Sequence, residues 1–156
     1  MKIFYLKILI KALTLLQKPY WEVREELKNI VVEIEKAPEK ATLIYDSDLV
    51  IVARAYTKEA YSDALLGAVE MGLANRTYRQ KYGKFADSLN QLTPEILPSL
   101  PLDSFTGKNY IYRKRDKGFI VYSVGDNLKD DGGISQNEKK WQGDFDIVWE
   151  DSGAGS

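Results

Sequence analysis

The sequence predicts an α+β fold in which N-terminal helices and a long central helix pack against a small three-stranded antiparallel sheet. Apolar residues recur at helical spacing through the first half of the chain, and no proline falls between Leu49 and Tyr82. Three later segments alternate apolar and polar residues, which is typical of half-buried strands. Such a small sheet is not stable alone, so we expect it to pack on the helix that ends at Tyr82.

Two helices are predicted before residue 38. The first covers residues 3–16, and its polar residues form one narrow stripe: Lys7, Lys11, Thr14 and Lys18. The rest of its circumference is apolar, which favours a core helix over one that contacts a partner or a membrane surface. The second helix starts at Pro19, where a missing N–H costs nothing, and it stops before Pro38.

The central helix is predicted from Leu49 to Tyr82, with Asp46 or Ser47 as its N-terminal cap. A break near Tyr56–Lys58 is the alternative to one continuous helix. Small residues recur along one side of this helix: Ala60, Ala64, Gly67, Ala68 and Gly72. Because small residues permit close approach, we interpret this side as a packing seam and not as a site.

The strands are predicted at residues 109–114, 119–124 and 145–149. The first two are joined by Asp116-Lys117-Gly118, a hairpin turn with glycine where a positive φ costs little. We therefore divide the chain into a helical segment (1–45), a head made of the long helix and the sheet (46–151), and a flexible tail (152–156).

Composition excludes several classes of site. The chain has no cysteine and no histidine, which rules out disulfides, thiolate or imidazole metal sites, and histidine-dependent catalysis. Residues 126–151 carry eight Asp or Glu and three Lys, whereas the net charge of the whole chain is −1. An acidic end of this kind suggests a cation site or simple solvation, and it argues against nucleic-acid binding.

The acidic loop before the last strand carries the candidate cation ligands. Side-chain oxygens cluster at Asp126, Asn127, Asp130 and Asp131, and the returning chain adds Asp144 and Asp146. Calcium takes six to eight oxygen ligands from carboxylates, amides and backbone carbonyls, whereas magnesium keeps its waters and seldom uses a protein cage. The residues alone leave two interpretations open, namely a calcium site and a solvated acidic turn without an ion.

Several short motifs occur in a familiar order. A helix closes at Arg76–Phe85, and Asp87–Leu92 and Leu100–Gly107 follow. A tyrosine-rich hairpin, Tyr122–Gly125, Asp130–Gly133 and a final Asp146-Ile147 strand complete the order. Over about residues 74–149 the chain resembles the C-terminal head of the major pseudopilin of type II secretion systems. It also looks like pseudopilin-type heads that are appended to larger envelope proteins.

The resemblance implies a calcium ion in the loop after the second strand. The carbonyl of Val124 matches a backbone ligand of the family, Asn127 falls on its first acidic ligand, and Asp130 and Asp131 match its acidic pair. Asp126 stands where the family is usually uncharged, so it is expected to compensate for the lower charge of Asn127.

The chain also departs from the family. Ala86 and Ser104 stand where the family usually has proline, the pilin-type leader is absent, and the first 70 residues do not resemble a pseudopilin. These departures indicate either a fragment of a longer, membrane-anchored chain or a protein that reuses the head.

The predicted function is a non-enzymatic assembly or scaffolding module of a pseudopilus-like, type II secretion-related system in the cell envelope or periplasm. Its expected partners are other proteins, either pseudopilin-like subunits or further copies of itself, and no nucleic acid. We interpret the basic run Arg113-Lys114-Arg115 at the hairpin as solvated charges that keep the edge of the sheet from pairing with another strand. No segment of the chain is long and apolar enough to be a predicted transmembrane helix.

Two other classes of function remain open. A periplasmic ligand-binding or sensor domain would need a deep aromatic pocket. A carboxylate hydrolase would need a cleft with two facing acids. The aromatic residues expected to divide between core and surface are Tyr110, Tyr112, Tyr122, Trp141 and Trp149.

Overall fold

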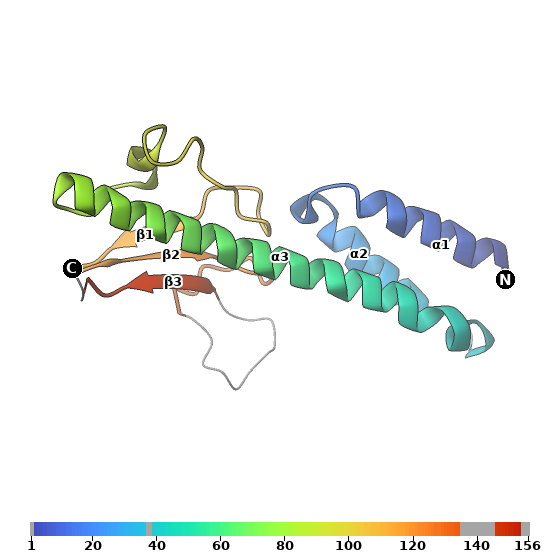
Figure 1. Cartoon of the computed structure of the whole chain (residues 1–156). Coiled ribbons are helices and arrows are strands. Elements are labelled where there is room, and N and C mark those ends of the chain that lie inside the picture. The colour runs from blue at the N-terminus through green and yellow to red at the C-terminus, as the bar shows by residue number, and fades with distance from the viewer. Residues whose placement is uncertain (1, 37–38, 135–145, 154–156) are drawn as a thin grey trace. The chain divides into compact units, whose positions relative to one another are not determined.

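The structure, a computed structural model, describes residues 2–36, 39–134 and 146–153 (Figure 1). The chain forms two compact units, unit 1 (Met1–Ala60) and unit 2 (Tyr61–Ser156). The elements, in chain order, are α1 (Lys2–Leu15), α2 (Tyr20–Glu35), α3 (Glu39–Tyr82), the 3-10 helix η1 (Leu89–Leu92), and the strands β1 (Ile111–Lys114), β2 (Phe119–Ser123) and β3 (Ile147–Asp151). The predicted α+β fold class is confirmed.

Helix α3 is one uninterrupted helix that begins in unit 1 and ends in unit 2. It starts at Glu39, so the prediction of a cap at Asp46 or Ser47 is wrong, and the alternative of a break near Tyr56–Lys58 is wrong as well. Helix-forming residues on both sides of these positions carry the helix through them. The predicted boundary at residues 45/46 lies within α3, and the division between the two units falls later in the same helix.

Unit 1 is built from α1, α2 and the first part of α3. Helix α2 buries the apolar residues that the sequence places on one side of it: Val23, Leu27, Ile30 and Ile34. Polar contacts join the elements of the unit. The hydroxyls of Tyr20 and Thr57 lie 3.2 Å apart, and the Tyr56 hydroxyl donates to the carbonyl of Lys18. The unit is therefore held by an apolar core with hydrogen bonds at one end of α2.

Unit 2 contains an antiparallel sheet in the order β1-β2-β3. The central strand β2 is buried along its whole length, because it pairs on both sides: Tyr122 lies opposite Ile111 and Val148, and Val121 lies opposite Trp149. The first two strands fall inside their predicted ranges. The third strand begins two residues later than predicted, at Ile147, and runs to Asp151.

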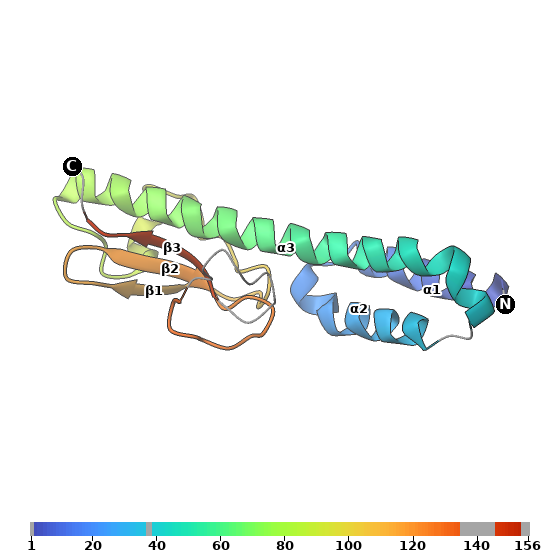
Figure 2. The same cartoon turned by 90° about the horizontal axis from the view of Figure 1, so that it is seen from below.

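The small-residue side of α3 packs on this sheet, which confirms the predicted seam (Figure 2). A Cβ atom added to Gly67 would lie 2.3 Å from the Tyr110 hydroxyl, and one added to Gly72 would lie 2.2 Å from the Trp149 ring. Ala64 and Ala68 of the same side have no exposed surface. Glycine and alanine thus let large aromatic side chains approach the helix backbone.

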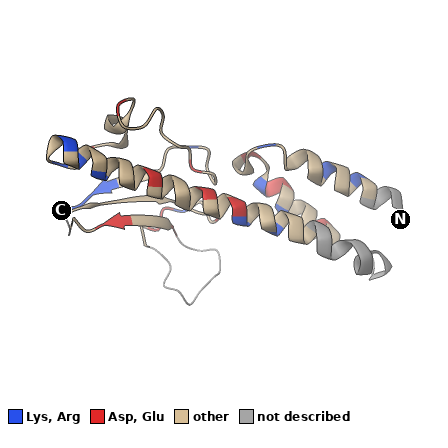
Figure 3. Cartoon of the chain, viewed as in Figure 1, with Lys and Arg blue, Asp and Glu red and all other residues tan. Residues whose placement is uncertain are grey.

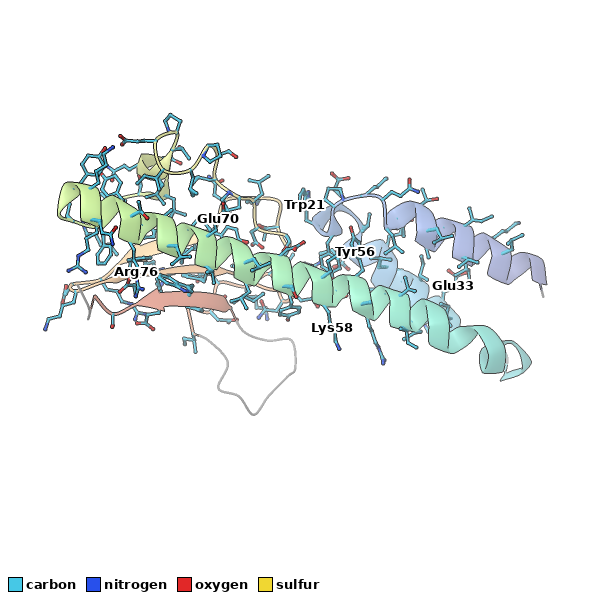
Figure 4. The ribbon with its side chains drawn as sticks, viewed as in Figure 1. Trp21, Glu33, Tyr56, Lys58, Glu70 and Arg76 are labelled. Atoms are coloured by element: carbon cyan, nitrogen blue, oxygen red, sulfur yellow. The ribbon has the colours of Figure 1, made fainter. Side chains whose placement is uncertain are left out.

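Polar residues of α3 also tie the helix to unit 2. The fully buried side chain of Asn75 donates to the Tyr112 hydroxyl at 3.1 Å and accepts from the backbone N–H of Ala86 at 2.9 Å. One residue later lies Arg76, which is labelled in Figure 4. Its guanidinium contacts the carboxylate of Asp151 in β3 at 2.5 Å. The end of α3 is therefore fixed to both the following loop and the last strand.

Candidate functional site in the acidic loop

The loop that joins β2 to β3 holds most of the predicted calcium ligands. Val124 directly follows β2, and Asp126, Asn127, Asp130 and Asp131 lie in the described part of the loop. Asp146 directly precedes β3. Asp144 and Trp141 lie outside the described residues.

Glycine is required at one bend of this loop. Gly133 has φ +76°, and a Cβ atom there would lie 2.4 Å from the Ile120 side chain. Glycine therefore lets the loop backbone bend at this position, where a residue with a Cβ atom would be strained.

Asp130 is held by three donors from different parts of unit 2. One of its carboxylate oxygens accepts from the Tyr122 hydroxyl at 2.8 Å and from the backbone N–H of Gly132 at 2.9 Å. The other oxygen accepts from the Arg113 guanidinium at 2.7 Å. The hydrogen bond from Tyr122, followed by that from Gly132 and the charge of Arg113, lowers the pKa of Asp130. The carboxylate therefore stays ionised and carries an internal counter-ion.

Asp146 fixes the loop from the other end. Its side chain is buried, and its two oxygens accept from the backbone N–H groups of Asp131 at 3.4 Å and Gly133 at 2.7 Å. Burial raises the pKa of Asp146, although both hydrogen bonds favour its ionised form. A buried carboxylate with two backbone donors is a structural clamp on the chain segment that it holds.

Asn127 and Asp131 pair with each other. The Asn127 amide donates to the Asp131 carboxylate at 2.9 Å, and its oxygen accepts from the backbone N–H of Lys129 at 2.9 Å. The amide oxygen that the resemblance assigns to calcium is thus used inside the loop.

These contacts decide how well the loop fits a calcium ion. Within the described residues, no group of three or more acidic side chains is arranged to hold a metal ion. At Asp130 the cation in contact is the guanidinium of Arg113, and a second cation there would meet charge repulsion. The donor set of the described loop accommodates calcium only if Arg113 leaves Asp130.

The basic run Arg113-Lys114-Arg115 lies at the surface of unit 2. All three side chains are exposed, and each faces a carboxylate: Asp130 for Arg113, Asp87 for Lys114 and Glu150 for Arg115. The run is therefore solvated at an edge of the sheet, as predicted. The sequence did not indicate that Arg113 would be the partner of the acidic loop.

Sequence reasoning missed the residue that anchors the start of the loop. Asp103 is 2% exposed, and its oxygens accept from the backbone N–H of Phe105 at 2.9 Å, the Thr106 hydroxyl at 3.0 Å and the Ser123 hydroxyl at 2.8 Å. Ser123 in turn accepts from the backbone N–H of Gly125 at 3.0 Å. An aspartate followed by Ser-Phe-Thr is the available signal, because aspartate caps the backbone of such turns.

The predicted aromatic set divides between core and half-buried positions. Tyr110 and Tyr122 are buried, whereas Tyr112 and Trp149 are half-buried and pack against the core around Phe119. The Tyr110 hydroxyl donates to the carbonyl of Ala64 at 3.0 Å, and burial raises the pKa of Tyr110 well above its usual value. These rings serve the packing of unit 2.

No described helix is both long and apolar enough to cross a membrane. Comparison of the chain with protein-family models, with curated proteins and with solved structures finds no match. The resemblance to pseudopilin heads, and the envelope localisation that it implies, therefore stay predictions.

Proposed function

We propose that the chain is a non-enzymatic assembly module of a pseudopilus-like, type II secretion-related envelope system, in which unit 2 packs against further copies of itself. The observation that carries this proposal is a row of exposed leucines on α3 in unit 2. Leu65, Leu66 and Leu73 are 45%, 64% and 53% exposed. We call these three residues the α3 leucine row.

Leu66 and Leu73 lie on the side of α3 opposite its buried residues, and Leu65 lies about 100° around the helix from Leu66. Ala64, Ala68 and Met71 are fully buried, while Leu66 and Leu73 are seven residues apart and therefore share a face two turns long. Covering a leucine side chain contributes about 1.5–3 kcal/mol. On this face Leu66 and Leu73 offer apolar contacts to a partner between the exposed polar residues Ser62, Glu70 and Thr77.

Sedimentation velocity over a range of protein concentrations tests this proposal. We expect concentration-dependent association of the wild type, and a loss of more than tenfold in the association constant for Leu66→Gln combined with Leu73→Gln. Leu102→Gln is the matched control, since Leu102 is 50% exposed in unit 2 and lies outside α3. A wild type that stays monomeric, or a control that loses as much association as the double variant, would contradict the proposal.

The proposal includes calcium as a stabiliser of the acidic loop. Asp126, Asp130, Asp131 and Asp146 supply carboxylates in the described part of the loop, and Asn127 supplies an amide. In this proposal calcium replaces Arg113 as the counter-ion of Asp130. The loop would then present a fixed protein–protein surface beside β3.

Thermal unfolding of calcium-stripped protein tests this part, with magnesium as the ionic control. Ligand at about 100 times its dissociation constant adds about 2.7 kcal/mol, which raises the midpoint by several degrees for a chain of this size. We expect Asp130→Ala to abolish the rise. Arg113→Ala is the informative control, because it removes the competing cation and leaves every proposed ligand in place, so its calcium response should exceed that of the wild type. Absence of a calcium response in both the wild type and Arg113→Ala would exclude the ion.

A further inference from the structure

Helix α1 presents two separate apolar faces. Ile8, Ala12 and Leu15 are each 5% exposed, and their spacing of four and three residues places them on one side, which belongs to the core of unit 1. A second set is exposed to solvent: Leu6 57%, Leu9 41%, Ile10 56% and Leu13 53%. The core-helix interpretation from the sequence thus holds for only one side of α1.

The exposed apolar residues form a continuous stripe. Their spacing of three, one and three residues is that of a single helix face, and at about 100° per residue this face does not overlap the buried one. We call Leu6, Leu9, Ile10 and Leu13 the outer stripe of α1. Four large aliphatic side chains on two turns of helix are more than the scattered exposure that a surface normally shows.

Lysines lie along one edge of the outer stripe. Lys7 and Lys11 are exposed, and Lys18 follows them with the same helical spacing. The first 21 residues contain four lysines and neither aspartate nor glutamate. Figure 3 accordingly shows blue but no red along the described part of α1. Lys11 contacts Glu26 of α2 at 3.1 Å, so this acidic side chain lies beside the lysine edge and not over the outer stripe.

We propose that the outer stripe of α1 binds the surface of a lipid bilayer that contains anionic lipids. Helices that lie in the plane of a membrane interface combine a stripe of large apolar residues with lysines at its border. The leucine and isoleucine side chains would enter the acyl boundary, while the lysine ammonium groups reach the anionic headgroups. The charge of α1 is complementary to such a surface along its whole length.

A second copy of the chain suits this face less well. In a twofold interface the same patch meets itself, so a second α1 offers no acidic residue to the lysine edge, and an antiparallel pair brings the two lysine edges to the same side. Like charges at such a distance repel each other, and no acidic residue of α1 is present to offset them. The inference rests on unit 1 alone and does not depend on the function proposed for unit 2.

Co-sedimentation of the full chain with lipid vesicles tests the inference. The vesicles are pure phosphatidylcholine or phosphatidylcholine with about 30% phosphatidylglycerol, whose negative surface attracts basic segments. We expect binding to the anionic vesicles, weaker binding to the neutral ones, and loss of the difference at about 0.5 M salt, where the charges are screened.

Three variants separate the contribution of the apolar side chains of the outer stripe from that of the lysines. Leu6→Gln/Ile10→Gln/Leu13→Gln should lower the partition coefficient at least 100-fold, because three apolar side chains no longer enter the bilayer. Lys7→Gln/Lys18→Gln should lower the partition coefficient on anionic vesicles about 25-fold, because each lysine contributes about fivefold. The control Ile51→Gln/Leu102→Gln removes two comparably exposed aliphatic side chains, 59% and 50% exposed, that lie outside both α1 and the α3 leucine row, and it should bind as the wild type does.

The outcomes that overturn the inference are distinct. Circular dichroism first verifies that each variant keeps its helices. Absence of wild-type binding to anionic vesicles overturns the inference. Equal binding to both kinds of vesicle, unaffected by the lysine variant, overturns the assignment of an anionic surface. Self-association that the outer-stripe variant abolishes, without vesicle binding by the wild type, assigns the stripe to a second copy of the chain.

Discussion

Replacing Asp103 by alanine should be among the most damaging single changes in unit 2. The carboxylate joins the turn at residues 103–107 to the last residue of β2, through Phe105, Thr106 and Ser123. Alanine removes the acceptor for all three donors at once. The acidic loop begins directly after Ser123, so its starting point would lose its anchor as well.

The expected loss follows from the burial of the donors. Phe105 and Ser123 are each 1% exposed, so the backbone N–H of the first and the hydroxyl of the second would be left without water. An unpaired buried polar group costs about 1–3 kcal/mol, and hydrogen bonds to a charged acceptor lie toward the upper end. Thr106 is half-buried and can turn to solvent. We therefore expect Asp103→Ala to lower the free energy of unfolding by about 3–5 kcal/mol.

Urea unfolding followed by tryptophan fluorescence measures this loss. A Trp21→Phe background leaves Trp141 and Trp149, both in unit 2, as the only reporters. With a slope of about 1–3 kcal/mol per M urea, the midpoint should fall by more than about 1 M. Thr106→Val keeps the side-chain size and should cost less than about 1 kcal/mol. A loss below about 1 kcal/mol for Asp103→Ala would refute the reasoning that this carboxylate holds the turn.

Three further changes test the rest of unit 2. Gly67→Ala gains about 1 kcal/mol of helix propensity but forces its methyl group against Tyr110, so we expect a net loss of about 1–2 kcal/mol in urea unfolding; a gain would contradict the tight seam. Asn75→Ala leaves a buried backbone N–H unpaired and should cost about 2–3 kcal/mol by the same measurement, whereas a neutral result would mean that the loop relaxes around it. Burial acts to raise the pKa of Asp151, but the hydrogen bonds from Arg76 and from the backbone N–H of Gly153, together with the charges of Arg76 and Arg79, lower it below 3.8. This carboxylate therefore stabilises the folded state above about pH 3.8 and loses that contribution as the pH falls through its folded pKa. Asp151→Asn should be less stable than the wild type at neutral pH but less sensitive to acid between about pH 5 and pH 2, and parallel pH profiles would contradict this.

The sequence predicted the elements of unit 2 well because their signals are local. Alternation of apolar and polar residues marked β1 and β2, and the turn at residues 116–118 marked the hairpin between them. The positive φ expected at Gly118 is wrong: glycine is needed there because a Cβ atom would lie 1.8 Å from the carbonyl oxygen of Asp151. The small residues at Gly67 and Gly72 predicted a packing seam correctly. The start of α3 was missed, because Asp46 and Ser47 are good caps but are also tolerated inside a long helix.

The candidate site was predicted only as a list of acidic residues. Spacing along the chain showed that Asp130 and Asp146 return to the same loop, but it did not show what each carboxylate contacts. Arg113 comes from the neighbouring hairpin, and its contact with Asp130 depends on how β1 and β2 pair. Such contacts join residues that are far apart in the sequence, so no local sequence pattern predicts them.

By itself, the sequence determined the fold class, the absence of histidine and cysteine chemistry, and the acidic character of the loop before β3. Composition and periodicity are properties of the chain alone, and they suffice for these conclusions. Only the tertiary structure decided that Asp103 anchors β2, that Arg113 faces Asp130, and that α1 keeps a second apolar face in solvent. The physical reason is that burial and ion pairing depend on which residues the fold brings together. The apolar stripe of a helix does not show by itself how much of the stripe a neighbouring element will cover.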